Sequence, residues 1–267
     1  MSYVVMSWLG SNGRLGNQMF QYALMVGIAK RTGLQIQVNN DGSDVSKIFD
    51  IERNNAVVPI SRWFTEKGAT EFTPDVEHLK YAGGNLGISR GYFQSEKYFI
   101  HAREEVCSAF KFRDTTTLPN AKSHVDSIRI ELPVVAIHVR RGDYLALSDY
   151  HPFDAGYYKR AIKTIYESLG RCSFIVVSDD IEWCRMFFGK SEFADFGTFA
   201  FNCGSPSQDL GVMQQADHVI IANSSFSWWG AWLNRSVSKV VIAPSMWFGP
   251  RGPKKWSDVY AKGWVTV

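Results

Sequence analysis

Two adjacent arginines stand at the end of a strongly hydrophobic segment in the middle of the chain. Arg140 and Arg141 follow the apolar run that ends at Val139, and runs of this length are typical of strands buried in a parallel sheet. A guanidinium group offers planar, permanently charged donors that suit phosphate oxygens. Because ligands of open α/β sheets bind at the carboxyl ends of the strands, the pattern predicts an anion site here, and specifically a phosphate site.

The alternation of side chains along this strand separates the two arginines. His138 and Arg140 are expected on one side of the extended chain and Val139 and Arg141 on the other, so one arginine can face a ligand while the other pairs with an acid such as Asp143. Without a ligand, both arginines would need internal salt bridges, because a buried charge without a partner is costly. Residues 141–143 also spell the adhesion tripeptide Arg-Gly-Asp, but a strand end is not an exposed loop tip, and an adhesion function is not expected.

Two further loops carry polar residues that packing alone does not require. The segment Gly13-Arg-Leu-Gly-Asn-Gln18 precedes a helix whose free N–H groups can receive an anion. It is neither a P-loop nor a dinucleotide fingerprint, and a simple capping turn is the alternative. Asn223-Ser-Ser225 joins a strand to another helix and offers a second such site, unless a serine of this loop only caps the helix. The tryptophans within residues 228–232 are expected to form a packed face rather than a sugar platform.

Strands and helices alternate along the chain in the pattern of doubly wound parallel sheets. The predicted strands are residues 3–8, 34–38, 88–94, 132–139, 173–178, 218–222 and 239–243. The predicted helices are residues 18–31, 96–112, 154–170, a short one through Phe188, 207–215 (with Ser207 as its cap) and 226–233. Residues 39–85 are expected to form loops and short helices, and residues 113–129 a polar connection between two α/β domains, 1–125 and 126–267.

Composition excludes several classes of protein. Hydrophobic residues make up 45% of the chain and charged residues 21%, as in ordinary globular proteins. The net charge is only +3, without a block of basic residues, so nucleic acid is not an expected partner. The four cysteines lack the spacing of metal ligands and indicate reduced thiols of a cytosolic protein. The first ten residues form an apolar run of strand length without a basic leader, so neither a signal peptide nor a membrane anchor is expected.

Four segments, taken together and in order, resemble the inverting α-1,2-fucosyltransferases that use GDP-fucose (glycosyltransferase family eleven). They are Gly13-Arg-Leu-Gly-Asn-Gln-Met-Phe-Gln-Tyr-Ala23, Gly91-Tyr-Phe-Gln-Ser-Glu-Lys-Tyr-Phe99, His138-Val-Arg-Arg-Gly-Asp-Tyr144 and Ala222-Asn-Ser-Ser-Phe-Ser-Trp-Trp-Gly-Ala-Trp232. The resemblance implies a GT-B architecture, in which two Rossmann-like domains face each other across a cleft. Residues 1–125 would form the acceptor-side domain and residues 126–267 the GDP-fucose-binding domain, with no metal and no cofactor.

The resemblance also implies roles for individual residues. His138 and Asp209 would contact the guanine end of GDP-fucose, Arg140 and Ser225 would hold the β-phosphate, and Asn17 would reach the sugar nucleotide from the opposite domain. The predicted catalytic residues are Arg140, Asp143 and Asn17. The predicted donor-binding set is Arg14, Gly16, Asn17, His138, Arg140, Asp179, Asp209, Asn223, Ser224, Ser225 and Phe226. A hydrogen-bond donor of the protein that contacts the β-phosphate would stabilise the negative charge that builds up there as the bond to the sugar breaks.

The base that accepts the proton of the acceptor hydroxyl is less defined by the sequence. Asp143, Asp149 and His151 lie in the loop after the arginines, and Asp143 is the first candidate. Asp143 could instead hold Arg140 or Arg141 in place. A loose transition state also lessens the need for a strong base.

The implied function is that of a galactoside α-1,2-fucosyltransferase, which moves L-fucose from GDP-fucose to a terminal galactose of a glycan with inversion. The expected acceptor is a surface polysaccharide or its lipid-linked repeat, which would bring a cytoplasmic, bacterial-type enzyme to the membrane surface only transiently. A fucosyltransferase of another linkage or a transferase for another nucleotide sugar is the alternative. A non-enzymatic module for nucleotide sugars or glycans would bind GDP without releasing it from GDP-fucose when acceptors are offered.

Overall fold

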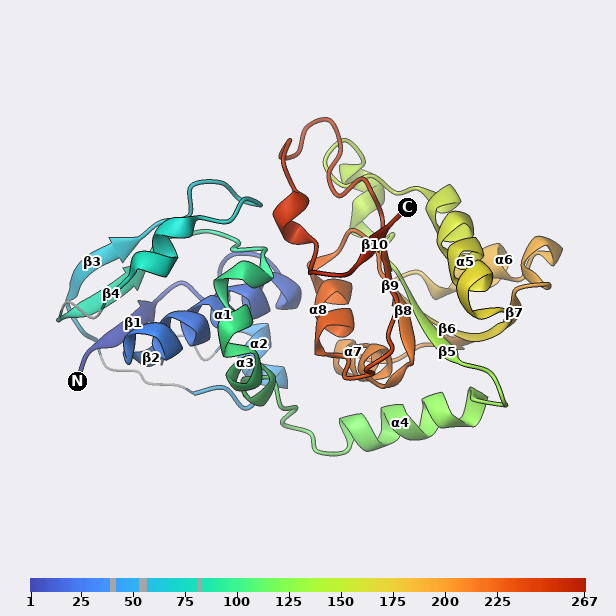
Figure 1. Cartoon of the computed structure of the whole chain (residues 1–267), viewed down its shortest axis with the longest axis horizontal. Helices are drawn as coiled ribbons and strands as arrows, with labels where there is room; N and C mark the ends of the chain where they lie inside the picture. The colour runs from blue at the N-terminus through green and yellow to red at the C-terminus, as the bar shows by residue number, and fades with distance from the viewer. Residues whose placement is uncertain (39–41, 53–56, 81–82) are drawn as a thin grey trace. The chain divides into compact units, whose positions relative to one another are not determined.

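The computed structural model describes residues 1–38, 42–52, 57–80 and 83–267, which form two compact units (Figure 1). The first unit consists of residues 1–114 and 255–261, and the second of residues 115–254 and 262–267. The boundary expected from the sequence, at residues 125 and 126, falls inside helix α4 (Thr117–Ile128). That whole helix belongs to the second unit, and the chain returns once to the first unit near its end.

The first unit is built on a four-stranded parallel sheet with strand order β2-β1-β4-β3. Its strands are β1 (Tyr3–Met6), β2 (Gln35–Val38), β3 (Ile60–Phe64) and β4 (Asn85–Ile88). Helix α1 (Leu15–Thr32) connects β1 to β2 and is buried on most of its surface. It ends at Gly33, which has a left-handed backbone and donates its N–H to Ala29, so the predicted strand–loop–helix–strand opening is confirmed.

Three predictions for the first unit are wrong. The strand expected at residues 88–94 ends at Ile88, and a loop follows it. The single helix expected at residues 96–112 is broken into η2 (Glu96–Tyr98), η3 (Ile100–Ala102) and α3 (Arg103–Ala109), because the backbone of Phe99 leaves the helical region. The segment 39–85 contains the unpredicted strand β3. Its short helices α2 (Asp44–Ile48) and η1 (Pro74–His78) agree with the prediction, while its residues 39–41, 53–56 and 81–82 lie outside the described residues.

The second unit is built on a six-stranded parallel sheet with strand order β10-β9-β8-β5-β6-β7. The strands are β5 (Val134–Val139), β6 (Cys172–Ser178), β7 (Gly197–Asn202), β8 (His218–Ile220), β9 (Val241–Ala243) and β10 (Val265–Thr266). The helices are α4, α5 (Ala155–Leu169), α6 (Ile181–Phe188), α7 (Pro206–Gln215) and α8 (Ser225–Leu233). β5 is central and buried along its whole length, as its sequence predicts.

Helices cover both faces of this sheet, as Figure 1 shows for α5 and α6 on one side and α7 and α8 on the other. The alternate residues Val135, Ile137 and Val139 of β5 pack with α5 and α6 in one hydrophobic core. His138 instead contacts Phe226 of α8. The two faces therefore follow the alternation predicted from the sequence.

Capping residues explain why the helices of the second unit begin where they do. Asp154 accepts the N–H of Gly156 and begins α5, which ends at Gly170, as predicted. The predicted cap Ser207 of α7 is wrong. Ser205 is the N-cap, and it forms a reciprocal capping box with Gln208, which satisfies two backbone donors at once.

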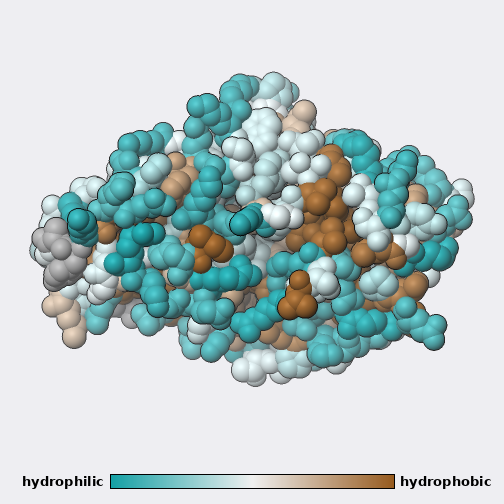
Figure 2. Space-filling model, viewed as in Figure 1, coloured by the Kyte–Doolittle hydropathy of each residue, from teal (hydrophilic) through white to brown (hydrophobic). Residues whose placement is uncertain are grey.

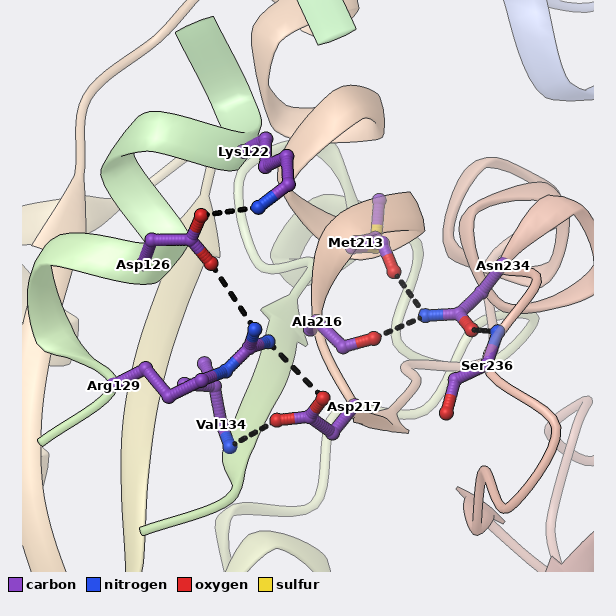
Figure 3. A network of polar contacts seen from close by, with 9 residues as sticks. All are labelled: Lys122, Asp126, Arg129, Val134, Met213, Ala216, Asp217, Asn234 and Ser236. Carbon is purple, nitrogen blue, oxygen red and sulfur yellow. Dashed lines mark hydrogen bonds and ion pairs between the residues drawn. The ribbon is translucent and has the colours of Figure 1, made fainter. Parts of the chain in front are cut away.

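Helix α4 is the largest error in the second unit, because residues 113–129 were expected to be an irregular connection. Pro119 is compatible with the helix because it lies in the first turn, where backbone N–H groups have no intrahelical partner. Arg129, just after the helix, pairs with Asp126 and with Asp217, at 3.0 Å each (Figure 3). Asp217 also accepts the N–H of Val134, at 2.8 Å. These contacts fasten α4 to the start of β5.

The tryptophans of α8 form part of the core. Trp228, Trp229 and Trp232 are at most 2% exposed and contact one another, so the expected packed face is confirmed. No helix among the described residues is long and apolar enough to cross a bilayer. On the face shown in Figure 2, hydrophilic residues cover most of the surface between smaller apolar areas.

Candidate functional site

Arg140 follows the central strand β5 and lies between two carboxylates. Its Nη2 is 2.6 Å from Oδ1 of Asp143, and its Nη1 is 2.9 Å from Oδ2 of Asp179. The guanidinium carbon is also 5.7 Å from the ring centre of Tyr144, and the side chain is only 19% exposed. Since Asp179 follows the neighbouring strand β6, the site is formed where two parallel strands end, as the sequence predicts.

The side chain of Arg141 contacts other groups than the two carboxylates that hold Arg140. Its Nη1 pairs with Asp180, and its guanidinium carbon lies 5.1 Å and 5.7 Å from the ring centres of Trp183 and Phe153. The backbone N–H of Arg141 donates to Asp179 at 2.9 Å. The alternatives left open by the sequence are thereby decided, because Asp143 pairs with Arg140 whereas Arg141 pairs with Asp180.

Asp179 was predicted only as a residue that binds GDP-fucose, but it also holds the turn after β5. Besides pairing with Arg140, it accepts the N–H groups of Arg141 and of Gly142, at 2.9 Å and 3.2 Å. A Cβ atom at Gly142 would lie 2.8 Å from its Oδ2, so a side chain at residue 142 would displace this carboxylate. Asp179 therefore fixes the turn that carries Arg140, and a guanidinium group with five N–H donors is not exhausted by its two carboxylate contacts.

His138 lies beneath this turn and is buried. Burial, and secondly the charge of Arg140, lowers its pKa to about 3, so its imidazole is neutral at physiological pH. Its Nδ1 is buried and has no hydrogen-bond partner among the described residues. A buried polar atom without a partner is uncommon in native proteins, and this ring nitrogen is therefore suited to a ligand's polar group.

The loop between β8 and α8 contacts the segment after β5, because the hydroxyl of Tyr144 donates to the carbonyl of Asn223 at 3.0 Å. Ser224 is the N-cap of α8 and accepts the N–H of Phe226, and Ser225 is the first residue of that helix. The amide of Asn223 donates to the carbonyls of Pro152 and Trp247, at 3.2 Å and 3.1 Å. Both Asn223 donor contacts are thus to the backbone, which makes it a support for the loop.

Asp209 lies on α7, which packs against α8. Its carboxylate accepts a hydrogen bond of 2.6 Å from Asn202, at the end of β7. Burial raises the pKa of Asp209 to about 7, while hydrogen bonds from Asn202 and from the backbone of Gly204 oppose that shift. A buried carboxyl group with a pKa raised to about 7 is a candidate ligand-binding group.

The candidate bases differ in their surroundings. The imidazole of His151 stacks on Tyr144 with ring centres 4.4 Å apart, and burial lowers its pKa. The side chain of Asp149 is exposed, and its backbone carbonyl accepts the N–H of Arg251. Asp143 alone among the three pairs with Arg140, and it stays the first candidate.

In the first unit, the glycine-rich loop is joined to the loop after β4. Oδ1 of Asn17, in the first turn of α1, accepts a hydrogen bond of 2.7 Å from Gln94. The backbone of Gly13 is left-handed, and a Cβ there would lie 2.3 Å from Nδ2 of Asn17, so glycine is required. Arg14 is the N-cap residue of α1, and Gly16 is buried in its first turn. The structure therefore brings together two of the segments that carry the resemblance.

Glu66, Gln94 and Gln21 belong to this joined region but were not among the predicted site residues. Glu66 follows β3, a strand that the sequence did not reveal. Gln94 lies within a recognised segment, but nothing in its sequence context distinguishes it from a surface amide. Among the described residues, no cluster of three or more His, Cys, Asp or Glu side chains could hold a metal ion.

Comparison with known proteins identifies the family. The family model for glycosyl transferase family 11 matches residues 5–267. An α-1,2-colitosyltransferase of Escherichia coli is 30% identical, over 96% of each chain. The galactoside 2-α-L-fucosyltransferase Sec1 of Mus musculus is 28% identical, over 83% of this chain and 62% of the mouse protein.

Solved structures show the fold. The NodZ α-1,6-fucosyltransferase co-crystallised with GDP matches with a TM-score of 0.57 and 12% identity, over 86% of this chain and 91% of that one. POFUT1 in complex with GDP matches with a TM-score of 0.52 and 14% identity, over 99% and 98%. These likenesses confirm the predicted GT-B fold class. The chain is thus a glycosyltransferase and belongs to glycosyltransferase family 11.

Proposed function

We propose that the protein transfers L-fucose from GDP-fucose to a terminal galactose of a glycan, forming an α-1,2 linkage with inversion and without a metal ion. The observation that carries this proposal is the placement of Arg140 at the end of the central strand, held by Asp143 and Asp179. A buried, neutral His138 and the N-terminal end of α8 lie in the same unit at the ends of adjacent strands. This is a site suited to a nucleoside diphosphate.

The proposed reaction places negative charge where Arg140 can receive it. The hydroxyl oxygen of galactose attacks the anomeric carbon of fucose, the bond from that carbon to the β-phosphate oxygen breaks, and GDP leaves with the bonding electrons. The charge on the β-phosphate grows during this step, so a fixed guanidinium group stabilises the transition state more than the ground state. Because Asp143 and Asp179 already orient Arg140, little reorganisation is needed when the bond breaks.

The proton of the attacking hydroxyl must leave as the new glycosidic bond forms. Asp143 is the proposed base, and its contact with Arg140 would couple proton removal to phosphate binding. Asn17, in the first unit, is proposed to contact the sugar nucleotide, and Ser225 and Ser224 the β-phosphate. Asp209 and His138 are proposed for the guanine end. The other residues of the predicted set for binding GDP-fucose are proposed to shape the loops of the site, as Asn223 does through its two hydrogen bonds to backbone carbonyls.

A second donor is favoured by one comparison. The E. coli relative at 30% identity is a colitosyltransferase, and colitose is L-fucose that lacks one ring hydroxyl group. The runner-up is therefore transfer of colitose, or another deoxy sugar of this type, from its GDP derivative. A non-enzymatic binding module is disfavoured, because the family model covers residues 5–267.

The test is release of GDP from GDP-fucose and from GDP-colitose, with galactosides of β-1,3 and β-1,4 linkage as acceptors and EDTA present throughout. The proposal expects acceptor-dependent GDP release from GDP-fucose that EDTA leaves unchanged, and product analysis should show an α-1,2 bond. Release of GDP from GDP-colitose but not from GDP-fucose would identify GDP-colitose as the donor. GDP binding without release from either donor would overturn transfer altogether.

The acceptor class and its location follow from the same proposal. We expect a surface polysaccharide or its lipid-linked repeat unit as acceptor, and a cytoplasmic enzyme of bacterial type that meets such an acceptor at the membrane surface. Flotation of the protein with vesicles that do or do not contain the lipid-linked acceptor tests this expectation. Equal flotation with both would contradict it.

A further inference from the structure

Gln94 presents a buried amide oxygen that has no hydrogen-bond partner among the described residues. The residue is 9% exposed, and its Nε2 donates a hydrogen bond of 2.7 Å to Oδ1 of Asn17. Because the nitrogen is engaged by Asn17, the oxygen is turned away from that contact. A buried amide oxygen accepts hydrogen bonds only, so its missing partner must be an O–H or N–H donor.

The surroundings of Gln94 repeat this pattern. Gln21 is fully buried, and its Nε2 donates to the carbonyls of Asn12 and Gly91, at 2.9 Å and 3.2 Å. Its Oε1 also has no partner among the described residues. Two amide groups thus use their nitrogens to join the glycine-rich loop to the loop after β4, and each keeps an acceptor oxygen. Native interiors rarely leave such atoms unsatisfied.

Glu66 fixes the backbone that carries Gln94. Its two carboxylate oxygens each accept one N–H, from Tyr92 and from Phe93, at 2.8 Å in both cases. Phe93 adopts a left-handed backbone with φ of 54°, which is unfavourable for a bulky side chain. A Cβ at Gly91 would lie 2.7 Å from Oε2 of Glu66. The carboxylate therefore holds an otherwise strained turn immediately before Gln94.

The position of this assembly in the first unit is that of a ligand site. Glu66 follows β3, Gln94 follows β4, and Asn17 follows β1, so all three lie after the carboxyl ends of adjacent parallel strands. That edge is where open α/β sheets bind their ligands. The first unit thus carries a polar site of its own.

We propose that Oε1 of Gln94 accepts a hydrogen bond from a sugar hydroxyl of a substrate, and that Asn17 and Glu66 hold Gln94 in position for it. The inference rests on the proposed function, which supplies two sugars, the one on the donor and the one on the acceptor. A phosphate does not fit, because it offers acceptor oxygens to an atom that itself only accepts. The guanine end of the donor is proposed to contact His138 and Asp209 of the second unit.

The primary test is the variant Gln94→Ala, with kcat and KM measured separately for the GDP-sugar and for the galactoside. The expected result is a fall in kcat/KM of about tenfold or more, because a site built to bind a hydroxyl loses that interaction. A raised KM for the GDP-sugar identifies the donor sugar, and a raised KM for the galactoside identifies the acceptor sugar. Gln35→Ala, which alters an exposed glutamine of β2, is the matched control.

Deoxy substrates locate the hydroxyl. For one deoxy sugar, the kcat/KM of the wild type should fall by about the same factor as the kcat/KM of Gln94→Ala falls for the intact sugar. The kcat/KM of Gln94→Ala should not fall further with that deoxy sugar. Glu66→Gln has only one carbonyl oxygen for two N–H donors, so it should lower kcat/KM toward the same substrate. Its effect should not add to that of Gln94→Ala, because both act through one group.

The proposal is overturned if Gln94→Ala folds like the wild type, as judged by its melting temperature, and keeps kinetic constants equal to those of Gln35→Ala. Gln94→Asn, which keeps the amide but shortens its reach, replaces Gln94→Ala if the latter does not fold. Failure of the proposed function looks different, because the wild type itself would then release no GDP with any galactoside. In that event, calorimetric binding of GDP-fucose and of methyl galactoside to wild type and Gln94→Ala decides the inference, and equal affinities of the two proteins for both ligands refute it.

Discussion

Nη1 of Arg140 lies 2.9 Å from Oδ2 of Asp179, and this contact joins the carboxyl ends of the neighbouring strands β5 and β6. The same carboxylate receives the backbone N–H groups of the turn that carries the arginine. The position of the guanidinium group is therefore determined by the sheet, not by a flexible loop. Such preorganisation is what allows a charged group to stabilise a transition state.

Replacing Arg140 should abolish transfer without unfolding the protein. We expect Arg140→Ala to raise the activation barrier by at least about 3 kcal/mol, the size of effect seen when a preorganised donor is removed. Arg140→Lys should fail as well, because an ammonium group cannot reproduce the planar fork. GDP release at saturating donor measures the loss. Arg160→Ala, at an exposed ion pair with Asp154, is the control, and a folded Arg140→Ala enzyme with near-normal turnover would refute the role of Arg140.

Replacing Arg141 should mainly lower the stability of the protein, whereas replacing Arg140 should mainly lower its turnover. Its guanidinium group pairs with Asp180 and lies over the rings of Trp183 and Phe153, so Arg141→Ala removes the ion pair of Asp180 and this packing. We expect the free energy of unfolding to fall by about 1–3 kcal/mol, with a smaller loss of kcat than Arg140→Ala shows. Urea denaturation and initial rates measure the two effects. Unchanged stability together with abolished turnover would show that the roles of the two arginines are exchanged.

Asp143→Asn separates the two roles proposed for Asp143. If the carboxylate is the base, the variant should lose the acidic limb of the pH–rate profile, because an amide does not titrate. If it only holds Arg140, the rate should fall while the shape of the profile stays the same. We expect the limb to disappear, and an unchanged profile in Asp143→Asn would exclude the carboxylate as base.

The second unit could be predicted better than the first for a physical reason. Its strands β5, β6, β8 and β9 are buried and appear in the sequence as short apolar runs, and its α5 carries clear signals at Asp154 and Gly170. The edge strands β7 and β10 are more exposed and were not predicted. In the first unit, β3 lies at the edge of the sheet and alternates between half-buried and exposed residues, so its sequence shows no strong apolar run. Glu66 was missed together with that strand.

Within the candidate site, the types of residue could be predicted but not their partners. The pairing of Arg141 with Asp180 and of Arg140 with Asp179 depends on β6 lying beside β5, and such long-range adjacency leaves no local pattern in the sequence. The left-handed backbone of Phe93 is equally invisible, because the carboxylate that accepts its N–H belongs to Glu66, which lies elsewhere in the chain.

The carboxyl groups of Glu66 and Asp209 should make the stability of the protein decrease between mildly acidic and neutral pH. Burial is the main cause that raises the pKa of each to about 7, against the hydrogen bonds that each accepts. In the unfolded chain both groups titrate near their ordinary values of about 4, so between those values and about 7 the folded state binds more protons than the unfolded state. The free energy of unfolding therefore falls as the pH rises through this window.

Each group contributes a slope of at most about 1.4 kcal/mol per pH unit, and the contribution is complete below the unfolded pKa and lost above the folded one. Urea denaturation of the wild type at several pH values measures the slope. Glu66→Gln and Asp209→Asn should each flatten it, whereas Glu182→Gln, at an exposed side chain, should leave it unchanged. A slope that neither Glu66→Gln nor Asp209→Asn alters would mean that both carboxyl groups ionise in the folded protein as they do in the unfolded chain.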